Sequence, residues 1–145
     1  MRALVAASLA WPLLLGGALW QHRTAEPATW SSIVYLAASR VCHQIPARSF
    51  HTGGAQWPVC ARCAGLYLSA PIGACAAVLS LRRRRSAQSR RAVGWLVVAA
   101  VPTAITLGAE WLGLFPVTNM MRAVAALPLG AMIAVVLVRT AAGRI

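Results

Sequence analysis

The side chains best suited to chemistry are cysteines and histidines gathered in one polar segment of an otherwise apolar sequence. Cys60 and Cys63 form a Cys-x-x-Cys pair, and Cys42 lies earlier in the same segment. Two such sulfurs converge on a single turn and can bind one metal ion, and a distant Cys or His completes a tetrahedral site. Neighbouring residues seldom reach the same ion, so His51 is an alternative to His43 as a ligand. The pattern predicts a metal site, with zinc as the ion.

The same thiols allow two other interpretations. In an oxidising compartment Cys42 would form a disulfide with Cys60 or Cys63, or the Cys-x-x-Cys pair would act as a redox couple, its thiolates stabilised by Arg62 and a helix amino terminus. Alternatively, the cysteines have only a structural role, in which they crosslink their loop or are buried within it. Metal binding requires all three cysteines together, whereas thiol exchange requires only one or two of them.

Glu110 is the second candidate because it is the only charged residue within a long apolar segment. A carboxylate inside a membrane span is costly and is usually paired or faces a cavity. We expect Glu110 to pair with Arg122 or Arg62, with Asn119 hydrogen-bonded nearby. A weaker hypothesis is that the protein is a transporter or a lipid-binding protein that uses Glu110 and Arg122.

Arg48 lies between Gln44 and the directly following Ser49 in the cysteine-containing segment. A guanidinium group is planar and donates two parallel hydrogen bonds, which suits it to carboxylates and phosphates. These residues are therefore a candidate site for an anion such as a lipid phosphate, although a surface arginine is more often simply solvated.

The composition indicates a membrane protein. Of the 145 residues, 59% are hydrophobic and 11% are charged, and 14 basic residues stand against two acidic ones. All the basic residues are arginines that separate long apolar blocks, which is typical of loops flanking membrane spans. We therefore expect the lipid bilayer as partner and no nucleic acid.

Four apolar segments predict membrane spans in a single membrane domain covering residues 1–145, and the fold class is an all-α bundle. A further amphipathic segment is too short to span and predicts an interfacial helix, although a fifth span is not excluded. The expected elements are spans at about 3–20, 64–81, 92–115 and 123–138, an interfacial helix at 30–41, an irregular cysteine and histidine loop at 42–62, and an arginine-rich loop at 82–91.

The arginine-rich loop sets the expected orientation. Arginine-rich loops stay in the cytoplasm, so residues 82–91 are expected inside and residues 42–62 outside. The protein is then an inner-membrane protein with both termini in the cytoplasm. Small residues recur every four positions in the second span and predict a close-packed face, which would also allow a homo-oligomer. These residues are Gly65, Ser69, Gly73 and Ala77.

Three short motifs resemble those of the domain of unknown function 2085 family, small prokaryotic integral membrane proteins. They are Cys42-His43-Gln44, Arg48-Ser49-Phe50 and the run Pro58-Val59-Cys60-Ala61-Arg62-Cys63-Ala64-Gly65-Leu66-Tyr67. The resemblance continues more weakly through Pro102, Glu110, Gly113, Asn119, Arg122 and Gly130. It implies a membrane architecture and a site around these motifs, and it implies no reaction.

Two common catalytic devices are missing from the sequence. No aspartate is present, so a Ser-His-Asp triad is impossible, and no Gly-Lys phosphate-binding loop occurs. We therefore do not expect nucleotide-driven chemistry. We interpret the protein as a non-enzymatic or accessory membrane protein whose Cys/His cluster binds a metal. The thiol oxidoreductase that uses Cys60 and Cys63 stays open as the alternative.

Overall fold

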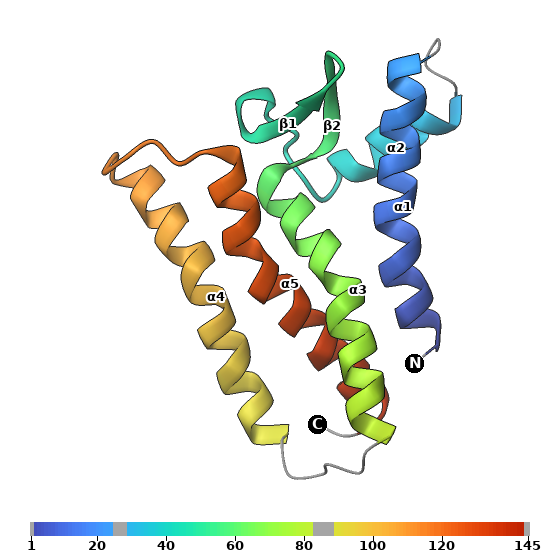
Figure 1. Cartoon of the computed structure of the whole chain (residues 1–145), viewed down its shortest axis with the longest axis vertical. Helices are drawn as coiled ribbons and strands as arrows, with labels where there is room; N and C mark the ends of the chain where they lie inside the picture. Colours follow the sequence, from blue (N-terminus) through green and yellow to red (C-terminus); the bar gives the residue numbers. More distant parts are fainter. Residues whose placement is uncertain (1, 25–28, 83–88, 144–145) are drawn as a thin grey trace.

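The structure is a computed structural model that describes residues 2–24, 29–82 and 89–143, and it confirms the predicted all-α membrane bundle (Figure 1). Within these ranges four helices are long and apolar enough to cross a membrane. They are α1 (Arg2–Thr24), α3 (Ala61–Arg82), α4 (Ser89–Trp111) and α5 (Asn119–Ala141). Of the expected arginine-rich loop at 82–91, residues 83–88 lie outside the described residues.

The central contact of the bundle is between α3 and α5. A Cβ atom at Gly65 or Gly73 would overlap a backbone carbonyl of α5, and one at Gly130 would overlap the backbone of Leu66 and the hydroxyl of Ser69. The small residues therefore let the two backbones approach closely, as they do in many membrane helix pairs. The close-packed face expected from the sequence is covered by α5 of the same chain.

The bounds of the four long helices differ from those of the predicted membrane spans. The expected span at 92–115 is α4, which ends at Trp111 because Gly113 adopts a left-handed conformation with φ of 64°. The amide of Leu114 donates to the carbonyl of Ala109 at 3.0 Å, and that of Gly113 to Glu110 at 3.3 Å, which is a Schellman motif. The other three candidate spanning helices extend beyond the predicted segments at both ends.

The expectation of an irregular loop is wrong for residues 49–60, which form an antiparallel hairpin of β1 (Ser49–Thr52) and β2 (Ala55–Cys60). Its turn is Gly53-Gly54, and both glycines have positive φ, at 58° and 80°. Two glycines at these positions suit the tight turns that join paired strands.

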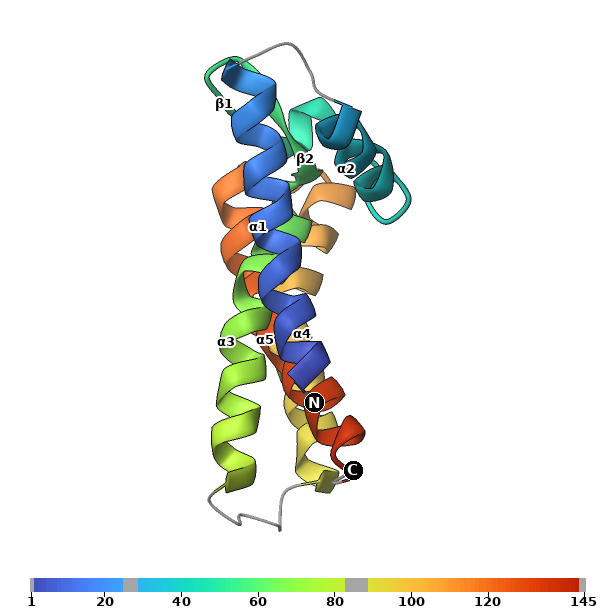
Figure 2. The ribbon, with the colours of Figure 1, turned by 90° about the vertical axis from the view of Figure 1, so that its right-hand side faces the viewer.

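The short elements gather at one end of the bundle. Helix α2 (Thr29–Ser39) and the 3₁₀ turn η1 (Pro46–Arg48) lead into the hairpin. In Figure 2 these elements lie at the end of the bundle opposite the carboxyl end of α3 and the start of α4. The structure thus separates a cysteine-bearing end from an arginine-flanked end.

Candidate metal centre

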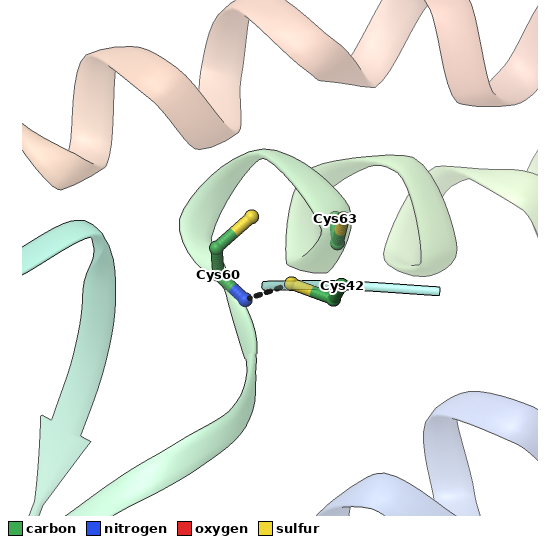
Figure 3. Close-up of side chains that lie close together, drawn as sticks. All are labelled: Cys42, Cys60 and Cys63. Carbon is green, nitrogen blue, oxygen red and sulfur yellow. Dashed lines mark hydrogen bonds between the residues drawn. The ribbon is translucent and has the colours of Figure 1, made fainter. Parts of the chain in front are cut away.

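Three different segments bring Cys42, Cys60 and Cys63 together. Cys42 follows α2, and its amide donates to the carbonyl of Ala38 at 2.9 Å. Cys60 ends β2, and Cys63 lies in the first turn of α3, which begins directly after Cys60. The three sulfur atoms all lie within 4.8 Å of one another (Figure 3). Sulfurs bound to one tetrahedral zinc ion at about 2.3 Å lie about 3.8 Å apart, so only a small closure separates this arrangement from a metal site.

The surroundings of Cys60 favour its thiolate form. The backbone amide of Cys60 donates to Sγ of Cys42 at 3.1 Å. A hydrogen bond from the Cys63 thiol lowers the pKa of Cys60 from its usual value to about 5. The amino terminus of α3 adds a positive dipole end beside both residues. None of the four cysteines, all of them described, is in a disulfide.

Gln44 fixes the cysteine segment against β2. Its side-chain amide donates to the carbonyls of Tyr35 at 2.8 Å and Pro58 at 2.7 Å. The backbone carbonyl of Gln44 accepts a hydrogen bond from the side-chain amide of Gln56 at 2.6 Å. The hydroxyl of Tyr35 donates to the backbone carbonyl of Gln56 at 2.7 Å. Gln44 has a φ of 48°, a left-handed conformation that these bonds hold in place. Cys42 is thereby held next to the end of the hairpin.

Neither histidine belongs to the three-sulfur group. His43 is exposed and lines the pocket beside the thiols, whereas His51 is exposed on β1 opposite Gln56. Within the part of the chain that the structure describes, the side chains close enough together to hold one metal ion are those of the three cysteines. The structure therefore brings three potential sulfur ligands together at this position, without either histidine.

Glu110 lies at the end of α4 in a cluster of arginines beside the cysteines. Its side chain is 9% exposed, and its carboxylate accepts hydrogen bonds from Arg62 and Arg122. Nε of Arg122 also donates to this carboxylate at 2.9 Å, and Nη1 donates to Asn119 at 2.6 Å. Nε of Arg48 lies 3.9 Å from the carboxylate. One carboxylate thus ties together three helices at the cysteine-bearing end.

Arg62 and Ser49 connect this ion-pair cluster to the cysteine site. Arg62 lies between Cys60 and Cys63 in the chain, so its pairing with Glu110 orients the first turn of α3. Ser49 is buried, and its backbone carbonyl accepts from the side chain of Asn119 at 2.9 Å. The hairpin is therefore fastened to α5 as well as to α3.

A pocket of about 200 Å³ opens beside the thiols. Its lining combines sulfur, guanidinium and apolar groups, and includes Val41, Cys42, His43, Ile45, Arg48, Cys60, Arg62, Cys63 and Arg122. A metal ion held by three protein ligands would keep a fourth position for an outside ligand, as catalytic zinc sites do. The space for such a ligand is this pocket.

Sequence reasoning did not single out Tyr35 or Gln56, which hold Gln44. Their role depends on the hairpin, which brings β2 beside α2, and no spacing of reactive residues marks them. The useful signal is the pair Gly53-Gly54, which predicts a turn and so places Gln56 near the start of a strand.

The fold and the site define a helical membrane protein with a three-cysteine centre next to a buried ion-pair cluster. The chain belongs to the family described as predicted membrane protein (DUF2085), whose model matches residues 42–136. This confirms the resemblance seen in the sequence motifs.

Among curated proteins, the chain is similar to an uncharacterized protein of Methanocaldococcus jannaschii. The two are 44% identical over 43 residues, which cover 30% of this chain and 28% of the relative. The similarity therefore spans less than a third of either protein. No solved structure matches the chain.

Proposed function

We propose that the protein is a membrane metal-binding protein in which Cys42, Cys60 and Cys63 bind one Zn²⁺ ion. The observation that carries the proposal is the convergence of three sulfurs from three segments to within 4.8 Å. Thiolates favour zinc over the hard cations magnesium and calcium, and zinc accepts a tetrahedral site with three protein ligands. The backbone amide on Cys42 and the amino terminus of α3 support the thiolate form that binding needs.

The proposed location follows from the distribution of arginines. The positive-inside rule places the α3–α4 connection in the cytoplasm, and the cysteine-bearing end then faces the outside of an inner membrane. With four spans in one domain, both termini are cytoplasmic. The separation of the hairpin from Arg82 and Ser89 along the bundle supports this arrangement.

Elemental analysis with thiol counting tests the metal site. Protein purified in detergent without chelator or an affinity histidine tag is expected to carry about one zinc ion per chain. The Cys60→Ser/Cys63→Ser variant is expected to lose the zinc, and Cys42→Ser should lose it too. Cys75→Ser is the matched control, because Cys75 is exposed on α3 and lies outside the three-sulfur group.

A second candidate function is thiol-disulfide exchange by Cys60 and Cys63. It is favoured by the pKa of Cys60, which the Cys63 thiol lowers to about 5, since a low pKa keeps a thiol in its nucleophilic form. Protein without metal and with two thiols missing from the count would contradict the zinc proposal and support this one.

A further inference from the structure

The pocket beside the cysteines has a positively charged wall. Arg48, Arg62 and Arg122 line it from η1, α3 and α5. Glu110 is the carboxylate that pairs with these arginines, so it neutralises one of the three positive charges. Two positive charges therefore remain next to a partly enclosed space, where electrostatic attraction is stronger than in open water.

Two guanidinium groups of this wall have unused donors. The side chain of Arg48 is 44% exposed, and its nearest carboxylate oxygen lies 3.9 Å away, which is beyond a normal hydrogen bond. Nε of Arg62 is buried and has no hydrogen-bond partner among the described residues. Arg122, by contrast, donates from each of its three guanidinium nitrogens to Glu110 or Asn119. Arg48 is thus the residue free to bind an incoming anion.

The charge of the loaded site indicates how negative that anion should be. A zinc ion with three thiolates carries one net negative charge, and the arginine wall contributes two positive charges. One positive charge is left, which a monoanion neutralises. Val41 and Ile45 add apolar surface to the same pocket. A carboxylate with a small organic group therefore fits better than a phosphate dianion.

Building on the proposed metal centre, we infer that the pocket binds an organic carboxylate. One carboxylate oxygen occupies the fourth coordination position of the metal, and the other accepts a hydrogen bond from Arg48. The organic group lies against Val41 and Ile45. The carboxylate comes from a small water-soluble acid or from a fatty acid at the membrane surface.

Cobalt substitution gives a direct test, because visible absorption of tetrahedral Co²⁺ reports its ligands. The full chain in detergent is loaded with Co²⁺ and titrated with acetate, and a saturable spectral change is expected. Arg48→Gln should bind Co²⁺ normally and require about tenfold more acetate, since a charge-assisted hydrogen bond is lost. Arg40→Gln removes an equal charge at an exposed position outside the pocket lining and should leave the acetate titration unchanged.

The outcomes separate this inference from the metal proposal. One Co²⁺ per chain with no response to acetate or octanoate overturns the carboxylate site and leaves the metal site intact. Failure to bind Co²⁺ or Zn²⁺ overturns both. Phosphate that competes as well as acetate overturns the preference for a carboxylate, and an unchanged Arg48→Gln overturns the role of Arg48. A response to acetate supports the site, and tighter binding of octanoate also supports it and identifies a fatty acid as the source.

Discussion

The chemistry of single residues at this site depends on neighbours that are distant in sequence. The pKa of Cys60 is low because the Cys63 thiol donates to it, and the carboxylate of Glu110 is buried where Arg62 and Arg122 donate to it. The sequence alone identified these five residues as candidates, through the Cys-x-x-Cys spacing, the lone acidic residue in an apolar segment and the arginines expected to pair with it. The sequence did not exclude His43 and His51 as metal ligands alongside the cysteines. Where the two imidazole rings lie is determined by the turn after α2 and by the register of the strands.

At this scale we expect an acidic titration of Cys60 in metal-free protein. The Cys63 thiol lowers the pKa of Cys60 to about 5, so the thiolate persists far below its usual range. The stability that this thiolate contributes is fully present above the pKa of the unfolded chain, about 8.5, and is lost as the pH falls through about 5. The rate of Cys60 alkylation by iodoacetamide, followed by mass spectrometry, should therefore reach half its maximum near pH 5.

Cys63→Ala removes the donor and should move this midpoint toward the usual value for a cysteine. Cys75→Ala, which leaves the site untouched, should not move it. A midpoint near pH 8.5 in the unsubstituted metal-free protein would refute the expected stabilisation of the thiolate.

The ion-pair cluster gives a second residue-scale prediction. Glu110→Gln removes the carboxylate that pairs with three arginines, and Arg122→Gln removes donors from a carboxylate that is 9% exposed. Breaking a buried ion pair costs about 3–5 kcal/mol because one charge is left unpaired. Both variants should lose similar amounts of folded protein, measured as the monodisperse fraction in size-exclusion chromatography. Normal yields of both would contradict the pairing, and Arg40→Gln is the matched control.

At the scale of elements, the α3–α5 pair positions the site, because α3 carries Cys63 and Arg62 while α5 carries Arg122. The fourfold repeat of small residues predicted the packed face, since close backbone approach needs small side chains. The end of α4 was not predictable from hydropathy, because the apolar run continues past Gly113 to Phe115. The hairpin was missed because its strands are short and carry mixed polarity, so the two turn glycines were the only strong signal.

Gly73→Ala tests the close approach of these two helices. The new Cβ would overlap the carbonyl of Ala131, and backbone atoms have little freedom to move away. We expect a loss of about 1–3 kcal/mol in the free energy of unfolding, as is typical of overpacking. Gly16→Ala on α1 is the matched control, because nothing lies within 4 Å of its added Cβ and alanine favours a helix by about 0.5–1 kcal/mol. Thermal unfolding in detergent, followed by circular dichroism, should show opposite shifts, and equal shifts would contradict the packing argument.

For the whole molecule, the composition was enough to predict an all-α membrane bundle, because long apolar blocks have few alternatives to spanning helices. Helix α2 is not a further candidate span, because its 11 residues reach only about 17 Å and cannot cross a bilayer core of about 30 Å. The three-cysteine group and the ion-pair cluster lie near one end of the bundle.

The orientation of the molecule gives the last prediction. If the arginines between α3 and α4 hold that connection in the cytoplasm, the hairpin and its cysteines lie outside, and the end of α5 lies inside. A chain truncated after Gly54 and fused to alkaline phosphatase should be active, because the enzyme folds only outside the cytoplasm. A green fluorescent protein fused after Ile145 should fluoresce, because it folds in the cytoplasm. Exchanging the two reporters is the control, and both exchanged fusions should be silent. The opposite pattern would place the cysteines in the reducing cytoplasm, where a disulfide is disfavoured, and would therefore argue against the disulfide interpretation of the three thiols.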